Sequence, residues 1–246
     1  GTGNDAVTIS TANMVAVDMG EKTSDTDTLT LVGTQNSGTG VINLASTTDQ
    51  IVNINGFAEA NVQVGIENVT LSAVTSTGSF GFQVTANAAG SVITGSQFND
   101  TIILGAGADD VVLLATNGVD TVTTFTAGTD DINVGALTTS TTFDGTMSAA
   151  GTSGTAKTLD DGDIYFVTGA SAGDADTKAA AATEITASGA FTNGTNGDIV
   201  YFVVVDDNST GIFKMVEAAG TEVEAAELTL IATFDAVAVS TSDFIF

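Results

Sequence analysis

Acidic and glycine residues recur at short spacings in the middle of the chain, in a pattern suited to binding a hard cation. Asp100 and Asp109 each stand two residues before an apolar residue, with Gly105 and Gly107 between them. Aspartate supplies a carboxylate oxygen, and a turn that bends at glycine exposes backbone carbonyls. These oxygen ligands suit the variable coordination of Ca²⁺ better than that of Mg²⁺. The nine-residue spacing therefore predicts calcium bound at the turns of a stacked β structure.

The first residues of the chain repeat this arrangement. Gly3 stands two residues before Asp5 and Val7 two residues after it, which matches the pattern in 107–111. We therefore expect Gly1, Gly3 and Asp5 to contribute to a second calcium site.

These phrases resemble the nonapeptide repeats of the RTX family, calcium-binding proteins that type I secretion systems export from Gram-negative bacteria. The resemblance covers about two regular repeats, and Leu104 stands where the family has the first glycine of a pair. It implies few calcium sites, each shared between coils, with Asp100 and Asp109 as a pair of rungs. Asp110 is expected to face solvent or a second ion.

Residues 118–134 resemble the segment that often closes an RTX β-roll, with an aspartate-threonine strand, a phenylalanine and a glycine-containing turn. Such a segment would cap an open end that otherwise exposes unpaired backbone. Asp120 and Asp130 are further candidate ligands. They rank below Asp100 and Asp109, because the step from Asp109 to Asp120 breaks the nine-residue period.

The composition excludes several classes of function. The chain has 30 acidic and 4 basic residues and a net charge of −26, which disfavours binding to nucleic acid or an anionic membrane. It has no Cys and no His, which excludes thiolate and imidazole metal sites and Ser-His or Cys-His catalysis. We expect no enzyme, although paired carboxylates of the glycosidase type stay open. Acidity could alternatively serve solubility alone.

The surrounding sequence predicts an all-β fold. Residues 1–135 contain many short apolar runs separated by Gly, Asn and Asp, and Asp5, Asp27 and Asp49 recur at 22-residue steps that suit one coil. These features predict a parallel β-solenoid or β-roll with calcium-binding turns, although residues 95–112 could instead form ordinary hairpins. Residues 136–163 are expected to be an irregular linker or insertion.

Residues 164–246 are expected to form a smaller, mainly antiparallel β domain with one short helix near 174–187 and a hairpin over 199–216. The last residues, Asp243 to Phe246, are similar to the terminal motif of type I secretion substrates. No apolar run approaches the roughly 20 residues of a membrane span. Because the chain starts at Gly1 inside a repeat, we expect a processed or truncated C-terminal portion of a longer protein, with a recombinant cut as the alternative.

Together these features favour a calcium-dependent extracellular structural protein that self-assembles at the surface of a Gram-negative bacterium, as a surface layer, filament or matrix. Its expected partners are copies of itself and an outer-membrane surface polysaccharide, without a transmembrane segment. The alternative is the C-terminal calcium-folding and secretion cassette of a larger RTX enzyme or adhesin.

Overall fold

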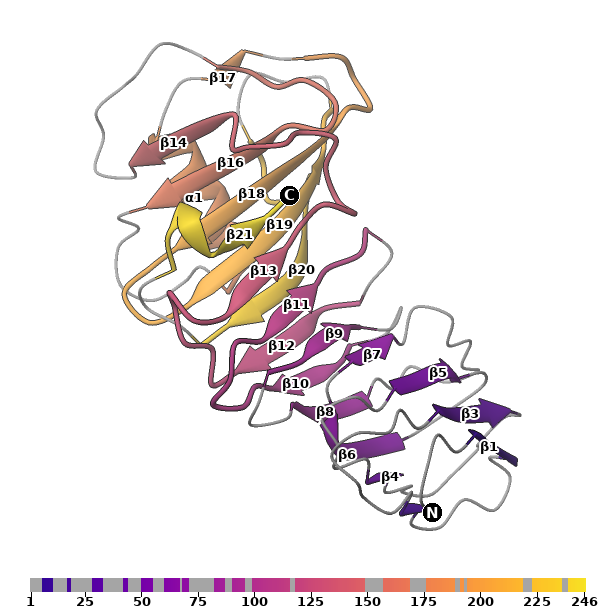
Figure 1. The fold of residues 1–246 in the computed structure, drawn as a ribbon. Helices are drawn as coiled ribbons and strands as arrows, with labels where there is room; N and C mark the ends of the chain where they lie inside the picture. The colour runs from indigo at the N-terminus through magenta and orange to yellow at the C-terminus, as the bar shows by residue number, and fades with distance from the viewer. Residues whose placement is uncertain are drawn as a thin grey trace. The chain divides into compact units, whose positions relative to one another are not determined.

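The computed structural model of the chain is mostly β-sheet with a short helix (Figure 1). The chain folds into two compact units, Gly1–Ile132 and Asn133–Phe246. Before residue 90 the structure describes the strands 6–10, 17–18, 28–32, 42–43, 50–54, 60–66, 68–70 and 82–86. From residue 90 onward it describes everything except 96–98, 116–117, 149–156, 169–175, 189–190, 193, 219–222 and 236–238.

One sheet of the first unit is built from parallel strands. Its spatial order is β1 (Ala6–Ser10), β3 (Thr28–Val32), β5 (Gln50–Ile54), β7 (Asn68–Thr70), β9 (Val92–Thr94), β11 (Asp110–Val112) and β13 (Asp131–Asn133). Ala6 lies opposite Thr28, and Thr28 lies opposite Gln50. The 22-residue step predicted from the acidic residues is therefore confirmed as the register of β1, β3 and β5.

A second sheet of the first unit takes the strands that fall between those in the sequence. Its order is β6 (Ala60–Ile66), β8 (Phe82–Ala86), β10 (Thr101–Ile103) and β12 (Asp120–Thr123), and these strands pair in parallel. A short parallel pair, β2 (Val17–Asp18) and β4 (Ile42–Asn43), accompanies them. Parallel partners need a crossover connection, and here a strand of the other sheet interrupts that connection.

The core of the described part of the first unit comes from the middle residues of very short strands. Each strand buries its central apolar side chain, while its neighbours on either side are more exposed. The fully buried examples are Val84, Ile93, Ile102, Val111, Val122 and Ile132. Burying one such side chain is worth roughly 1.5–3 kcal/mol, so the alternation of apolar and polar residues holds the strand in one register.

The second unit contains a mixed sheet. Its strands run in the order β14 (Gly145–Ser148), β16 (Ile164–Thr168), β18 (Ile199–Val205), β19 (Thr210–Val216) and β20 (Leu228–Phe234). The first three pair in parallel, and the last two follow antiparallel. The predicted β18–β19 hairpin is confirmed, but the expectation of a mainly antiparallel domain is wrong for the β14 side of this sheet.

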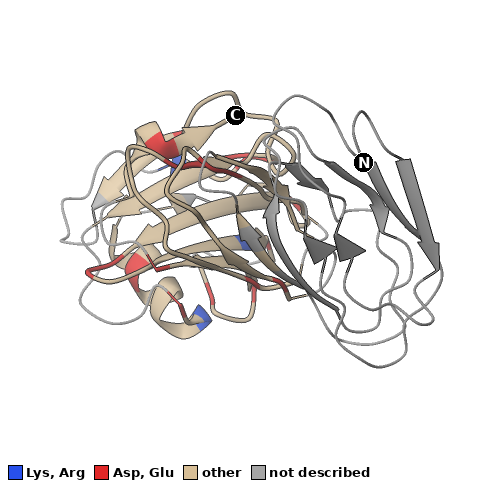
Figure 2. Cartoon of the chain, turned by 60° about the horizontal axis from the view of Figure 1, so that its bottom comes forward, with Lys and Arg blue, Asp and Glu red and all other residues tan. Residues whose placement is uncertain are grey.

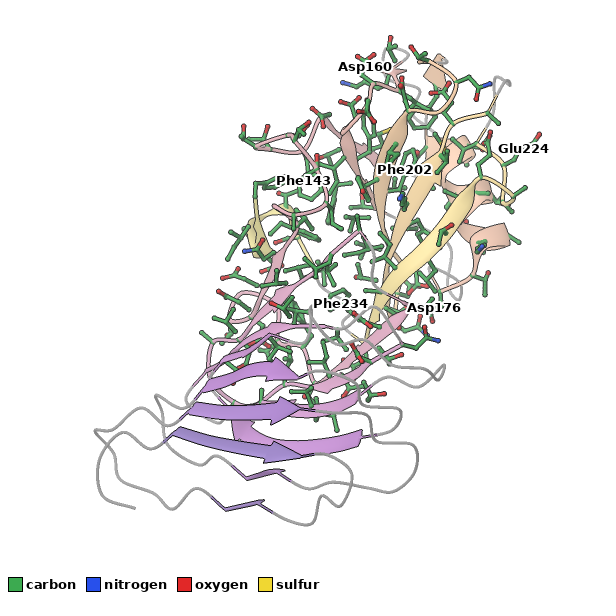
Figure 3. All side chains as sticks on the ribbon, turned by 90° about the vertical axis from the view of Figure 1, so that its right-hand side faces the viewer. Phe143, Asp160, Asp176, Phe202, Glu224 and Phe234 are labelled. Carbon is green, nitrogen blue, oxygen red and sulfur yellow. The ribbon has the colours of Figure 1, made fainter. Side chains whose placement is uncertain are left out.

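Helix α1 (Lys178–Ser188) covers one face of this sheet. It begins four residues after the predicted start of the helix at residue 174. Its Ala181, Ala182 and Ile185 pack into a core with side chains of β16, β18 and β19, among them Phe202 (Figure 3). No helix among the described residues is long and apolar enough to cross a membrane.

The segment predicted to be irregular, 136–163, contains β14 and β15 (Lys157–Thr158), which pairs with β17 (Phe191–Thr192). The C-terminus is folded into the second unit as a 3₁₀ turn, Thr241–Asp243, followed by β21 (Phe244–Ile245). The Phe143 ring meets the rings of both Phe244 and Phe246 edge to face.

Candidate metal centre

Four of the predicted ligands lie where strands of the first unit begin. Asp100, Asp109 and Asp130 directly precede β10, β11 and β13, and Asp120 is the first residue of β12. Their side chains are only 2, 0, 1 and 0 % exposed, respectively. Carboxylates are seldom fully buried without partners, so their hydrogen bonds decide what each can bind.

Two of the four carboxylates accept an amide from the preceding rung of the stack. The N–H of Asp100 donates to Asp120 Oδ1 at 2.9 Å, and the N–H of Asp109 donates to Asp130 Oδ1 at 3.0 Å. The neighbouring rungs are therefore Asp100 and Asp120 in one sheet, and Asp109 and Asp130 in the other. The expected pair of Asp100 with Asp109 is wrong, because these residues lead into β10 and β11, which belong to different sheets.

A second set of amides closes the turn that ends at each aspartate. Gly105 N–H donates to Asp109 Oδ2 at 2.9 Å, and Thr126 N–H donates to Asp130 Oδ2 at 2.7 Å. Both oxygens of Asp130 thus accept backbone hydrogen bonds. Gly105, predicted to contribute a carbonyl, uses its amide on Asp109, and Gly107 lies in the same turn.

Asp109 differs from Asp130 in having an open oxygen. Among the described residues, Asp109 Oδ1 is a buried carboxylate oxygen without a hydrogen-bond partner. Burial, as the largest effect, raises the pKa of Asp109 from 3.8 to about 6, and the charge of Asp130 also raises it. Hydrogen bonds from the Gly105 amide and from the hydroxyl and amide of Ser91 act in the opposite direction. An anionic oxygen in this position is the strongest candidate ligand for a cation in the described part of the chain.

Backbone carbonyl groups of Ser91 and Ala108 also lie where β9 and β11 begin. A Cβ added to Gly90 would stand 2.5 Å from the Ala108 carbonyl oxygen, and Gly90 has a φ of +112°. The Ser91 carbonyl accepts the Asp110 amide at 2.7 Å, which fixes the two turns against each other. Only a residue without a side chain fits at position 90, because the Ala108 carbonyl occupies that space.

Asp110 and Asp131 begin β11 and β13 and lie half-buried, outside the inner ladder. Burial raises the pKa of Asp110, and the charges of Asp131 and Asp130 raise it further. Gly1, Gly3 and Asp5, the expected N-terminal site, lie outside the described residues.

The second unit uses its acidic residues in a recurrent turn. In each case an acidic residue accepts the N–H of the residue three positions earlier and donates its own N–H to that residue's carbonyl. The four residues are Asp163, Asp198, Glu227 and Asp243, and β16, β18, β20 and β21 begin immediately after them. These carboxylates end turns and start strands by bonding back to the backbone three residues earlier, a local side-chain-to-backbone pattern.

Acidic loops gather at one end of the second unit, where Asp160 and Glu224 project (Figure 3). Figure 2 shows how few basic residues accompany the acidic ones in the described part. No group of three or more acidic residues among those described is arranged to hold a metal. The fit to calcium therefore rests on Asp109, whose Oδ1 has no hydrogen-bond partner among the described residues, whereas both oxygens of Asp130 already accept amides.

Sequence reasoning found the four buried aspartates but missed Gly90, Ser91 and Ala108. Ser91-Val92-Ile93 has the same frame as Asp109-Asp110-Val111, with serine in the place of aspartate. This shared pattern of a polar residue two positions before a buried apolar one was the sequence feature that could have identified Ser91. The sequence matches no profile of a known protein family and no curated protein.

Proposed function

We propose that the protein is a calcium-dependent extracellular structural protein that self-assembles at a bacterial cell surface, and that the first unit winds as a β-solenoid or roll. The observation that carries this proposal is the ladder of buried aspartates at the strand starts, with one open oxygen on Asp109. Side chains that could do chemistry are here committed to stacking neighbouring strands.

The charge of the chain supports the calcium requirement. With a net charge of −26, folding concentrates negative charge that only a cation can neutralise, since the chain has 4 basic residues. Asp109 would hold the ion, and the ion would supply the positive charge that its buried carboxylate lacks. Binding free energy then becomes folding free energy, and extracellular calcium at about 10⁻³ M suffices for weak sites.

Self-association, which we also propose, would need calcium for the same reason. Two chains with so few basic residues repel each other, so contacts between copies require screening or bridging by a divalent cation. A surface polysaccharide of the outer membrane is the proposed attachment partner. The proposal includes no catalytic step.

The test combines negative-stain electron microscopy and circular dichroism on the same samples, in EGTA and then in millimolar calcium. We expect calcium to increase β structure and to produce ordered sheets or filaments. Folding to a dispersed monomer would contradict assembly and favour a secretion and folding cassette. Identical spectra and particles with and without calcium would overturn the calcium requirement.

A further inference from the structure

We propose that the outer side of β10 and β12, which we call the uncharged face, is the surface through which one copy of the chain contacts a second copy. This inference deepens the function proposed above and rests on the self-association proposed there. Register defines the first row of the face as Asn61, Gln83, Thr101 and Thr121, from β6 to β12. Ile103 and Thr123 lie opposite each other in the next row.

The alternation of burial shows which side of these strands faces outward. Ile102 and Val122 pair with each other and are both 0 % exposed, whereas the preceding Thr101 and Thr121 are exposed. Successive side chains of a strand point to opposite sides of its sheet. Thr101 and Thr121 therefore lie on the outer side, in one row across neighbouring strands.

The acidic residues next to this row in the sequence are turned away from it. Asp100 directly precedes Thr101, and Asp120 directly precedes Thr121. Their side chains are only 2 and 0 % exposed. The aspartates of the ladder thus lie inside, and the residues that define the uncharged face include no acidic one.

The other sheet of the first unit is different at the corresponding positions. Asp110 and Asp131 are the first residues of β11 and β13, as Thr101 is of β10, and both are half-buried. Burial raises the pKa of Asp110, and the charge of Asp131 raises it further, so these two carboxylates repel each other. A second acidic chain packed on this sheet would add to that repulsion.

The charge of the chain identifies a second copy as the occupant. At a net charge of −26, two copies repel each other, and the core of a protein interface is depleted of charged residues. Two uncharged faces can stack about 10 Å apart without bringing the ladder carboxylates into the contact. A neutral polysaccharide suffers no such repulsion, so the separation of charge from this face matters most for a partner that is itself acidic.

The size of the face suits a repeated contact. Four strands about 4.8 Å apart, each with about three residues, cover roughly 20 by 10 Å. This area is well below the roughly 800 Å² that each partner buries in a stable complex. We therefore expect the contact to hold where it repeats in a sheet or filament, and one added carboxylate to disrupt it.

The first experiment compares the full-length T121E and T183E variants with the wild type in millimolar calcium, by sedimentation and electron microscopy. Thr183 is an exposed threonine of α1, so T183E makes the same change of charge away from the uncharged face. We expect T121E to weaken assembly about tenfold and T183E to leave it unchanged. Circular dichroism checks that both variants keep their β structure.

A second experiment uses the absence of cysteine, because a single introduced thiol then reports its own burial. The rate of maleimide labelling of T121C and T183C is measured below and above the protein concentration at which the chain assembles. We expect assembly to slow the labelling of T121C and not of T183C. A role of Thr121 in folding alone would give a rate independent of protein concentration.

The outcomes separate this inference from the proposed function. If the wild type and T121E assemble equally well, the uncharged face is wrong and self-assembly stands. If the wild type does not assemble in calcium, both fail. If T121E loses its β structure, the labelling of T121C decides, and equal rates in dispersed and assembled samples overturn the proposal. If T121E assembles normally but no longer sediments with outer-membrane polysaccharide, the face binds polysaccharide and the proposal is likewise overturned.

Discussion

Asp109 and Asp130 share a place in the fold but differ in the donors around them. Asp130 accepts an amide on each oxygen, from Asp109 and Thr126, whereas Asp109 accepts the Gly105 amide on Oδ2 and its Oδ1 has no partner of good hydrogen-bond geometry among the described residues. Both are almost fully buried. A charged acceptor with two amide donors stabilises its turn, but a charged oxygen with none opposes burial. The two aspartates therefore differ in how fully each buried carboxylate is hydrogen-bonded.

This contrast predicts opposite responses to a change that preserves shape. In EGTA at neutral pH, D130N is expected to lower the free energy of unfolding by about 1–3 kcal/mol, because the new NH₂ group faces an amide donor. D109N is expected to cost less or to stabilise, because it removes a buried charge. Urea unfolding followed by circular dichroism measures both. A larger loss for D109N than for D130N would contradict the hydrogen-bond assignment.

Glu217 gives a test of pH dependence away from the ladder. It is 5 % exposed, and its Oε2 accepts the Gly194 amide at 3.1 Å. Burial raises its pKa above 4.5, the Gly194 amide partly offsets this, and the charges of Asp198, Glu227 and Asp160 raise it further. Because the folded pKa is raised, the contribution of Glu217 is most favourable below pH 4.5 and is lost as pH rises through the folded value.

We therefore expect E217Q to gain stability relative to the wild type as pH rises from about 4 to 7. The measurement is urea unfolding at a series of pH values. The control is E224Q, since Glu224 belongs to the same acidic end but is exposed. A pH-independent difference between E217Q and the wild type would show that this carboxyl ionises without penalty.

At the scale of elements, the C-terminal strand closes one side of the second unit. Phe244 is 8 % exposed, and its ring lies 5.0 Å from Phe143 and 5.8 Å from Phe166, between centroids. The Ser240 amide donates to Asp243 Oδ2 at 2.7 Å and fixes the turn before it.

Removing the Phe244 ring should destabilise the second unit by about 3–5 kcal/mol, the usual effect of a buried phenylalanine-to-alanine change. F246A serves as the control, because Phe246 is only half-buried although it also meets Phe143. Differential scanning calorimetry should show a lower transition for F244A than for F246A. Equal transitions would mean that the terminal strand packs less tightly than described.

The sequence predicts well those strand pairings that follow from regular spacing of residues. The register of β1, β3 and β5 follows from equal steps between acidic residues, and the β18–β19 hairpin follows from two apolar runs around a polar turn. The Asp109–Asp130 pairing does not, because its step of 21 residues differs from the 18 residues between Val92 and Asp110 and the 20 between Thr101 and Thr121. Unequal coil lengths hide a register that only backbone pairing sets.

The β14–β16–β18 pairing of the second unit was unpredictable for another reason. Ile164 lies opposite Tyr201, and local periodicity carries no information on which distant strand a parallel strand selects. In the candidate site, Ser91 was missed because its shared frame with Asp109 becomes meaningful only once the register of β9 and β11 places the two residues next to each other.

For the whole molecule, net charge sets the response to ions. At a net charge of −26, repulsion between acidic residues opposes the compact state, and monovalent salt weakens that repulsion by screening. In EGTA we expect added NaCl to raise the melting temperature gradually. CaCl₂ at the same ionic strength is expected to raise it more, because a bound ion stabilises by mass action. Scanning calorimetry at matched ionic strength makes the comparison, and equal melting temperatures would reduce calcium to a screening ion.

The direction of the ladder has a consequence for biosynthesis. The amides of Asp100 and Asp109 donate to carboxylates that come 20 and 21 residues later in the chain. A ribosome adding about 5–20 residues per second makes each donor on the order of 1–4 s before its acceptor. Each of these turns therefore stays unfinished until the next one has been made, and a chain that stops between them ends with amides that have no acceptor.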